Sequence, residues 1–279
     1  MFDHARRGIL AALAAATFAV LPSQACLAAW PEQLIKVIVS FPPGGSSDIV
    51  ARALEPKVSA DLGQGIVIDN RPGAGGNLGI GAVARAAPDG YTLGIAVAGV
   101  LAVNPHLKQN IPFDPIKDLT PVTLVAKTAF VLAAWPNGPA RSVAEVIAVA
   151  KSSPEKMAIG HGGNGTAMHL TAALFTQKAQ VKVPLVAYRG TAPAANDVLG
   201  GHVPLAVLDI PTSQQLIIER KLLGLAVSST TRVATLPEVP TMVESGLQGY
   251  ESVGWFGLVA PAGTPADIVA KLNNGSRRL

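Results

Sequence analysis

The sequence has few of the groups on which most enzymes and nucleic-acid-binding proteins rely. Its 279 residues include one cysteine, five histidines and only 14% charged residues. A single cysteine excludes a framework of internal disulfides and any metal site built from paired cysteines. The 22 basic and 18 acidic residues give a net charge of +4 without a long Lys/Arg run, so the charge pattern predicts no nucleic-acid partner.

Motifs for catalysis and metal binding are also missing. The chain has no Gly-Lys pair for a Walker phosphate loop, no G-x-S-x-G turn for a serine hydrolase and no H-E-x-x-H for zinc. His161 and His169 are eight positions apart without a third ligand nearby, which is typical of solvated or capping histidines rather than of a metal site. We therefore expect a binding protein, with neither enzymatic activity nor a bound metal or cofactor.

The first 29 residues have the composition of an export signal. A basic start precedes a short apolar run at residues 9–21, and small residues follow it up to Ala29. This order predicts a secretory signal peptide over residues 1–29 and a periplasmic mature protein without a membrane anchor, because the run is too short to span a bilayer. Acylation of Cys26 is an alternative. Two basic residues and one acidic residue lie in this segment, which leaves 20 and 17 in the rest and a net charge of +3.

Short β-rich runs alternate with helical patterns along the rest of the chain. The runs expected to be strands are 35–41, 65–69, 91–97, 157–160, 181–187, 205–210 and 222–227. The patterns expected to be helices are 47–60, 77–87, 143–151, 166–178, 191–199 and 213–220. This alternation predicts an α/β protein with parallel sheets covered on both faces. In the helix at 166–178, the expected inward stripe is Ala167, Leu170, Thr171, Leu174 and Phe175.

Two longer β-like stretches, residues 119–134 and 251–260, fall outside this alternation. Each is expected to cross between two α/β lobes, so that the chain leaves the first lobe and later returns to it. This organisation predicts a first lobe over residues 30–126, a second lobe over residues 127–252 and a return to the first lobe over residues 253–279.

Two strand–glycine–helix turns are candidate anion sites. The first helical N–H groups lack intrahelical partners and carry partial positive charge, so such a turn can hold an anion. The turn in "FPPGGSSDIVARAL" offers free amides around Gly44 and Gly45 and hydroxyls from Ser46 and Ser47. The turn in "AIGHGGNGTAMHL" offers glycines followed by Thr166 as a helix cap.

The second turn also fits a dinucleotide fingerprint. Gly160, Gly162 and Gly165 satisfy G-x-G-x-x-G, and Arg189 at the end of a later strand is placed where a 2′-phosphate needs a partner. An NADP-dependent oxidoreductase built on these residues is therefore an alternative. The motif alone is common, and no second catalytic constellation accompanies it.

A series of motifs runs in one order from Trp30 to about Leu272. They are "FPPGGSSDIVAR", "DNRPGAGGNLG", "APDGYTL", "PFDPIKDLTPVTLV", "YRGTAPAANDVLGG", "LPEVPTMVESGLQGY" and "WFGLVAPAGTP". In these motifs the chain resembles the tripartite tricarboxylate transporter receptors, also called Bug-type solute-binding proteins. The resemblance implies a two-lobed fold of the type II periplasmic-binding-protein kind, with a mainly parallel sheet and flanking helices in each lobe. It also implies a monomeric receptor that binds a small carboxylate in the interlobe cleft and delivers it to the membrane permease subunits.

The resemblance places the ligand between the glycine turns of the two lobes, with "YRGTAP" as a third helix start. It implies that Asp209 faces the cleft and fixes a water or an amino group, whereas Trp255 is expected to pack at the hinge. Relatives often carry a hydroxyl after the third strand, where Gly99 and Val100 offer only amides and apolar surface. The expected ligand contacts are Phe41, Gly44, Gly45, Ser46, Ser47, Gly99, Val100, Gly163, Thr166, His169, Gly190, Thr191 and Asp209.

Two further expectations follow from the resemblance. A receptor that presents the acid to a membrane sensor, rather than to a transporter, is a second alternative.

Relatives continue the helix that begins near residue 266 and add a portion that packs on the first lobe. Here the sequence after Leu272 is polar and contains a glycine, so we expect this helix to end after about two turns and the first lobe to be truncated.

Overall fold

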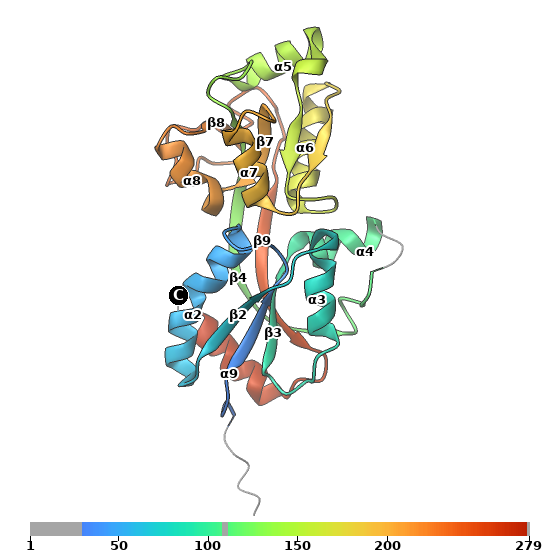
Figure 1. Ribbon diagram of the computed structural model, residues 1–279, viewed down its shortest axis with the longest axis vertical. Helices are drawn as coiled ribbons and strands as arrows, with labels where there is room; N and C mark the ends of the chain where they lie inside the picture. Colours follow the sequence, from blue (N-terminus) through green and yellow to red (C-terminus); the bar gives the residue numbers. More distant parts are fainter. Residues whose placement is uncertain (1–29, 108–110, 278–279) are drawn as a thin grey trace, which may run out of the picture.

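Two lobes joined by two long strands make up the described part of the chain (Figure 1). The structure is a computed structural model that describes residues 30–107 and 111–277. The expected signal peptide and Cys26 lie outside these residues. Within the described ranges, no helix has both the length and the apolarity needed to cross a membrane.

The strands form one continuous sheet that passes through both lobes. Its order is β2-β1-β3-β9-β4-β7-β5-β6, and β8 also pairs with β4. The strand bounds are β1 Ile35–Val39, β2 Ile66–Asn70, β3 Thr92–Val97, β4 Leu119–Ala134, β5 Ile159–His161, β6 Leu185–Ala187, β7 Leu205–Asp209, β8 Leu223–Val227 and β9 Val253–Pro261. Parallel pairing joins β1 to β2 and β3, and β5 to β6 and β7. The expected two-lobed α/β fold is confirmed.

The strands β4 and β9 connect the lobes. Residues 119–129 of β4 pair antiparallel with β9, while residues 130–134 pair with β7 and residues 131–134 with β8. One strand therefore belongs to the sheets of both lobes, as expected for residues 119–134. The lobe boundaries at 126/127 and 252/253 stay a prediction, because these strands run through the junction without a break.

Helices cover both faces of the sheet in the first lobe (lower half of Figure 1). Their bounds, with two short helical turns, are α2 Ser46–Leu62, η1 Ala74–Gly76, α3 Asn77–Ala84, η2 Gly99–Val103, α4 Asn104–Leu107 and α9 Ala266–Arg277. Val37 and Val39 of β1 pack in the core with α2 and α9, whereas Ile38 packs with α3 on the opposite face. Successive strand residues point to opposite faces, so β1 is buried on both.

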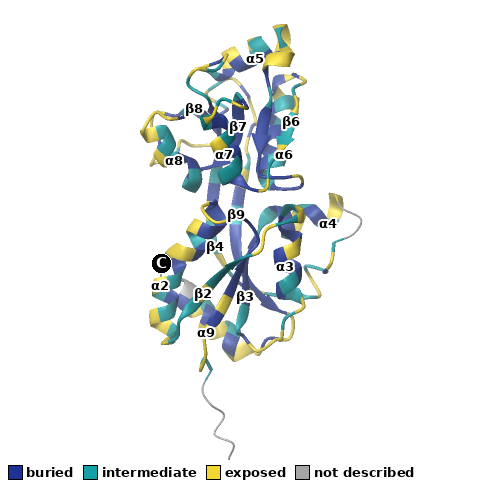
Figure 2. Cartoon of the chain, viewed as in Figure 1, coloured by how far each residue is buried: buried dark blue, intermediate teal, exposed yellow. Residues whose placement is uncertain are grey.

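The second lobe is built in the same way. Its helices are α5 Val143–Ser152, η3 Pro154–Lys156, α6 Ala167–Ala179, α7 Thr191–Leu199 and α8 Ile210–Ile218. Leu205 and Val207 of β7 pack in the core with α5 and α6, whereas Ala206 and Leu208 pack with α7 and α8. Figure 2 shows the central strands of both lobes buried, whereas β2 and β6 are only partly buried.

The inward face of α6 differs from the expected stripe. The helix buries Met168, Thr171, Ala172, Phe175 and Ala179, whereas Leu170 is 41% exposed. The expectation was right for Thr171 and Phe175 and wrong for Leu170. The alanines let the helix lie close to the sheet, so small residues occupy positions that hydrophobic periodicity assigns to large ones.

Helix α9 is longer than expected and β6 is shorter. The expected end of the last helix near residue 272 was wrong, because α9 continues through Gly275 to Arg277. A glycine inside a helix costs only about 1 kcal/mol relative to alanine. The expected strand at 181–187 is reduced to β6, and Pro184, which has no N–H to donate, lies just before it.

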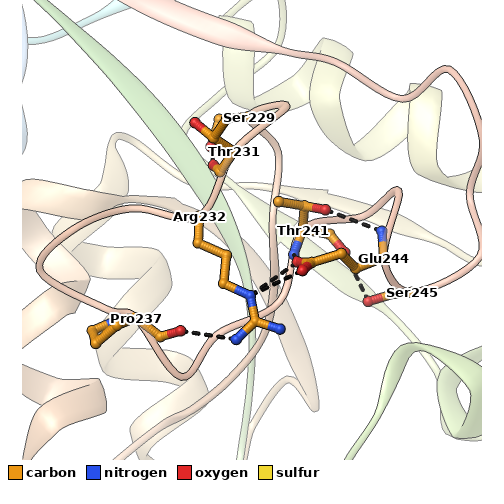
Figure 3. A network of polar contacts seen from close by, with 7 residues as sticks. All are labelled: Ser229, Thr231, Arg232, Pro237, Thr241, Glu244 and Ser245. Carbon is orange, nitrogen blue, oxygen red and sulfur yellow. Dashed lines mark hydrogen bonds and ion pairs between the residues drawn. The ribbon is translucent and has the colours of Figure 1, made fainter.

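A loop held by side chains connects β8 to β9 on the second lobe (Figure 3). The Arg232 guanidinium donates to both carboxylate oxygens of Glu244 at 3.1 and 3.0 Å and to the Pro237 carbonyl at 2.9 Å. Glu244 also accepts from the Thr241 amide and donates its own amide to the Thr241 hydroxyl. This reciprocal pair fixes the loop together with a parallel β-bridge between Thr241 and Val227.

The burial of α6 gives a matched pair of substitutions for stability. Phe175→Ala removes a fully buried ring and should lower the free energy of unfolding by about 3–5 kcal/mol. Leu170→Ala on the same helix removes an exposed side chain and should change it by less than about 1 kcal/mol. Urea denaturation of residues 30–279 measures both values. Equal losses in the two variants would contradict the assigned packing face.

Candidate functional site

A cavity lies between the two lobes, against the strands that connect them. Together with the open solvent at its mouth, it encloses about 540 Å³ of space. The connecting strands contribute Thr128 and Phe130 from β4 and residues 254–256 from β9. The other lining residues lie in the segments that follow β1, β3, β5, β6 and β7. Ligands bind at this edge of α/β sheets, where the carboxyl ends of parallel strands meet.

Three helices begin at this cavity. Helix α2 starts at Ser46 in the first lobe, while α6 starts at Ala167 and α7 at Thr191 in the second. Gly45 and Gly190, which precede α2 and α7, provide no side-chain cap. The first main-chain N–H groups of α2 and α7 are therefore available to a ligand. The positive ends of helices from both lobes point into the same cavity.

The carboxylate of Asp209 already lies among these helix ends. One of its oxygens accepts from the Ser46 hydroxyl at 2.5 Å and from the Thr191 hydroxyl at 2.6 Å, and the other accepts from the Thr212 amide at 3.3 Å. Asp209 is 1% exposed, and among the described residues that line the cavity it has the one ionisable side chain. Because Ser46 belongs to the first lobe, this carboxylate links the two lobes.

The lobes touch at two glycines. A Cβ atom at Gly99 would lie 2.7 Å from the Gly165 carbonyl oxygen and 2.9 Å from the Thr166 Cα across the junction. Gly190 has φ of +137°, and a Cβ there would lie 3.1 Å from Pro42 of the other lobe. The structure is therefore a closed form in which backbone from one lobe packs directly on the other.

Comparisons with known proteins agree with this architecture. The family model described as "Tripartite tricarboxylate transporter family receptor" matches residues 50–278. The chain belongs to this receptor family.

Individual relatives include proteins with bound acids. Protein BugT of Bordetella pertussis is 37% identical over 245 residues, which cover 88% of this chain and 75% of BugT. A solved structure of Rpa4515 of R. palustris with adipate is 35% identical, with a TM-score of 0.86, over 88% of this chain and 83% of that one. MatC of Rhodopseudomonas palustris with bound malate is 33% identical, with a TM-score of 0.84, over 89% and 85%.

The receptor brings eight of the expected contact residues to the cavity. These are Phe41, Gly45, Ser46, Ser47, Thr166, Gly190, Thr191 and Asp209. Val100 is instead fully buried in the core of the first lobe. Gly99 lies against Gly165 and Thr166 of the second lobe, where the lobes touch. Gly163 lines a second interlobe cavity. His169 lies in the first turn of α6 and does not line the first cavity; its Nδ1 accepts from the Gly165 amide.

Gly44 does not line the cavity because Asp48 holds it. The Asp48 carboxylate accepts from the Gly44 amide, from Arg52 at 3.0 Å and from Asn70 at 3.1 Å. Burial raises the pKa of Asp48, but these hydrogen bonds outweigh burial, and the net pKa lies below its ordinary value. Asp48 thus stays charged and braces the first glycine turn.

Apolar residues of the cavity were not among the expected contacts. They include Phe130, Met168, Trp255 and Phe256. Trp255 lies on a connecting strand, so it combines the expected hinge position with a place in the cavity wall. The apolar runs of β4 and β9 indicated crossing strands in the sequence. They did not show which of their side chains line the interlobe cavity.

The second glycine turn lacks two donors that a dinucleotide would need. The amides of Gly163 and Gly165 donate to the imidazoles of His161 and His169, each at 3.3 Å. Arg189 is exposed and lines the second interlobe cavity, which has a volume of about 1170 Å³. The turn therefore does not present the row of free amides with which a dinucleotide fold binds pyrophosphate.

The contact at Gly99 predicts an effect on closure. Gly99→Ala places a methyl group against the backbone of the other lobe, so it should shift the receptor towards an open form without unfolding either lobe. Small-angle scattering should show a larger radius of gyration at an unchanged melting temperature. Gly275→Ala, whose Cβ meets nothing closer than 3.7 Å, is the matched control. Equal radii in the two variants would contradict the prediction.

Proposed function

We propose that this receptor is exported, binds a small organic acid in the interlobe cavity and delivers it to the membrane permease of a tripartite tricarboxylate transporter. The convergence of three helix N-termini from both lobes is the observation that supports it most. A carboxylate placed there receives main-chain N–H groups from α2, α6 and α7, so the anion favours the closed arrangement of the lobes.

The cavity binds charge without a cationic side chain. A hydrogen bond to a charged group contributes about 1.5–3 kcal/mol, so a few convergent N–H donors approach the roughly 8 kcal/mol of micromolar binding, before ordering costs. The apolar wall formed by Phe130, Met168, Trp255 and Phe256 suits the hydrocarbon part of the acid. Backbone donors fix the carboxylate, and this wall selects the remainder of the molecule.

The relatives support aliphatic carboxylates as the first ligands to try. Rpa4515 and MatC have been solved with adipate and malate. Delivery to a permease agrees with the description of the matching family as a transporter receptor. Export agrees with the apolar segment at the start of the sequence.

A ligand screen by thermal shift tests the proposal. Adipate or malate should raise the melting temperature of the purified receptor, because a ligand at a hundredfold its Kd stabilises the folded state by about 2.7 kcal/mol. The corresponding diamides should not, since they lack the negative charge that helix N-termini attract. A set of aromatic and short monocarboxylates extends the panel. Stabilisation by NADP and by no acid would contradict the proposed function.

The hydroxyl of Ser46 should contribute to affinity. Ser46→Ala removes the donor by which the first lobe reaches Asp209, so binding of the best acid in the screen should weaken by about 1–3 kcal/mol. Ser59→Ala is the matched control, because Ser59 lies on the same helix and donates within it to Glu55. Calorimetry that gives one affinity for both variants would show that Ser46 has no part in closure or binding.

A further inference from the structure

Two imidazole rings contact the glycine turn of the second lobe, residues 162–166, outside the interlobe cavity. His161 ends β5 and His169 lies in the first turn of α6, and their rings stack with centroids 4.6 Å apart at an interplanar angle of 28°. Neither ring lines the interlobe cavity. The turn between them, residues 162–166, leads directly into the helix start that does line it.

Each ring accepts a main-chain hydrogen bond from this turn. The Gly163 amide donates to His161 Nδ1 and the Gly165 amide donates to His169 Nδ1, both at 3.3 Å. The Thr166 hydroxyl donates to the Gly163 carbonyl at 2.7 Å and accepts from the His169 amide at 3.2 Å. These hydrogen bonds thus hold the N–H groups of Gly163 and Gly165 directed at the two rings. The N–H groups of Ala167 and the next residue are left for the cavity.

This arrangement requires neutral rings. An imidazole Nδ1 accepts a hydrogen bond only when it has no proton, and a protonated Nδ1 would face an amide donor. Two charged rings 4.6 Å apart would also repel each other, and His169 would add positive charge at the positive end of α6.

No acidic group compensates for such a charge. His161 is fully buried, and its Nε2 has no hydrogen-bond partner among the described residues. The charged or titratable side chains around the pair are Lys178, Tyr188, Arg189, Asp197, Asp209 and Tyr250. Asp197 accepts from Tyr188, Asp209 accepts from Ser46 and Thr191, and Tyr250 donates to the Thr171 carbonyl of α6. In the described part of the chain, none of the six bonds to either ring.

Burial and the two rings together disfavour protonation. Burial lowers the pKa of His161 to about 4, and the charge of His169 acts in the same direction. Burial also lowers the pKa of His169. Both folded-state pKa values therefore lie below the ordinary histidine value of about 6.5. The neutral pair is intact above about 6.5, and its hold on the turn is lost as the pH falls through the lowered folded-state pKa values, about 4 for His161.

We propose that His161 and His169 are positioning residues for ligand binding: their neutral rings hold the turn of residues 162–166 in its binding geometry, and protonation releases it. The proposal rests on the proposed function, because it assigns the turn to the binding of the acid. The receptor would bind its acid most tightly at neutral pH and release it in an acidified medium. The released amides of Gly163 and Gly165 would then exchange with solvent.

Conservative and disruptive substitutions separate this role from packing. His161→Asn places an amide oxygen close to the position of Nδ1 and cannot titrate, whereas His161→Phe keeps the ring and removes the acceptor. His169→Asn makes the same conservative change at the second ring. His202→Gln is the control, because His202 is an exposed histidine outside the turn.

The first measurement is amide hydrogen exchange at Gly163 and Gly165 without any ligand. Both amides should be protected at about pH 7.5 in the parent receptor, and the Gly163 amide should lose protection towards about pH 4, where His161 takes up its proton. In His161→Phe the Gly163 amide should exchange fast at both values, and His161→Asn should restore much of its protection. Protection at Gly163 that is the same in the parent and in His161→Phe would overturn the proposal, whatever the receptor binds.

The second measurement is calorimetry with adipate or, if the screen finds a better one, with that acid. At about pH 7.5, His161→Phe should weaken binding roughly three- to tenfold, as expected for one lost hydrogen bond, and His161→Asn should recover most of it. The parent should lose affinity towards acid more steeply than the His161→Asn/His169→Asn double variant, and His202→Gln should follow the parent. Comparing variants at one pH cancels titration of the acid itself.

Equal slopes in the parent and the double variant would overturn the proposal, whereas an absence of binding in every protein at neutral pH would contradict the proposed function.

Discussion

A carboxylate held between two lobes is the contact on which the geometry of the site depends. Asp209 accepts hydroxyl hydrogen bonds from Ser46 of one lobe and Thr191 of the other, and it caps helix α8 through the Thr212 amide. A buried charge is stable only when donors surround it. These donors are available because α2 and α7 begin at the same cavity. Asp209 therefore shows that this junction supplies hydrogen-bond donors from both lobes.

The connecting strands explain why donors from both lobes meet. Because β4 pairs with β9 over residues 119–129 and with β7 and β8 beyond them, the two sheets are parts of one. The carboxyl ends of β1, β5 and β7 then face one another across the junction, and the helices that follow them start there. A larger residue would not fit at Gly99, which packs on the backbone of the other lobe, or at Gly190, which packs on the Pro42 ring.

The cavity of this receptor is lined by helix starts and, among the described residues, by no cationic side chain. Such a site depends on the conformation of its turns, and each turn has its own brace. In the first lobe the brace is Asp48, a carboxylate that holds the Gly44 amide. In the second lobe it is the pair of imidazoles that accept from Gly163 and Gly165. The first brace needs a charged group and the second needs neutral ones, so the two turns differ in their response to acid.

The sequence alone determined the order of elements and the candidate anion turns. Residues 119–134 were expected to cross between lobes and form β4 over that range, because a long β-rich run outside the βα alternation has few other places in such a fold. Ser46 and Thr191 could also be identified, since glycines followed by a hydroxyl and a helical pattern mark a helix start. These features are local, and local features are set by backbone preferences.

Tertiary structure decided which side chains meet. Ser46 and Asp209 are 163 positions apart, and nothing in either segment indicates the other. Val100 is buried in the core and Leu170 is exposed, although periodicity and position suggested otherwise, because burial depends on what packs against a residue. The stacking of His161 on His169 likewise arises from the path of the turn between β5 and α6. Contacts between distant segments are fixed by the packing of whole elements, and that packing is a property of the folded chain rather than of any single stretch of sequence.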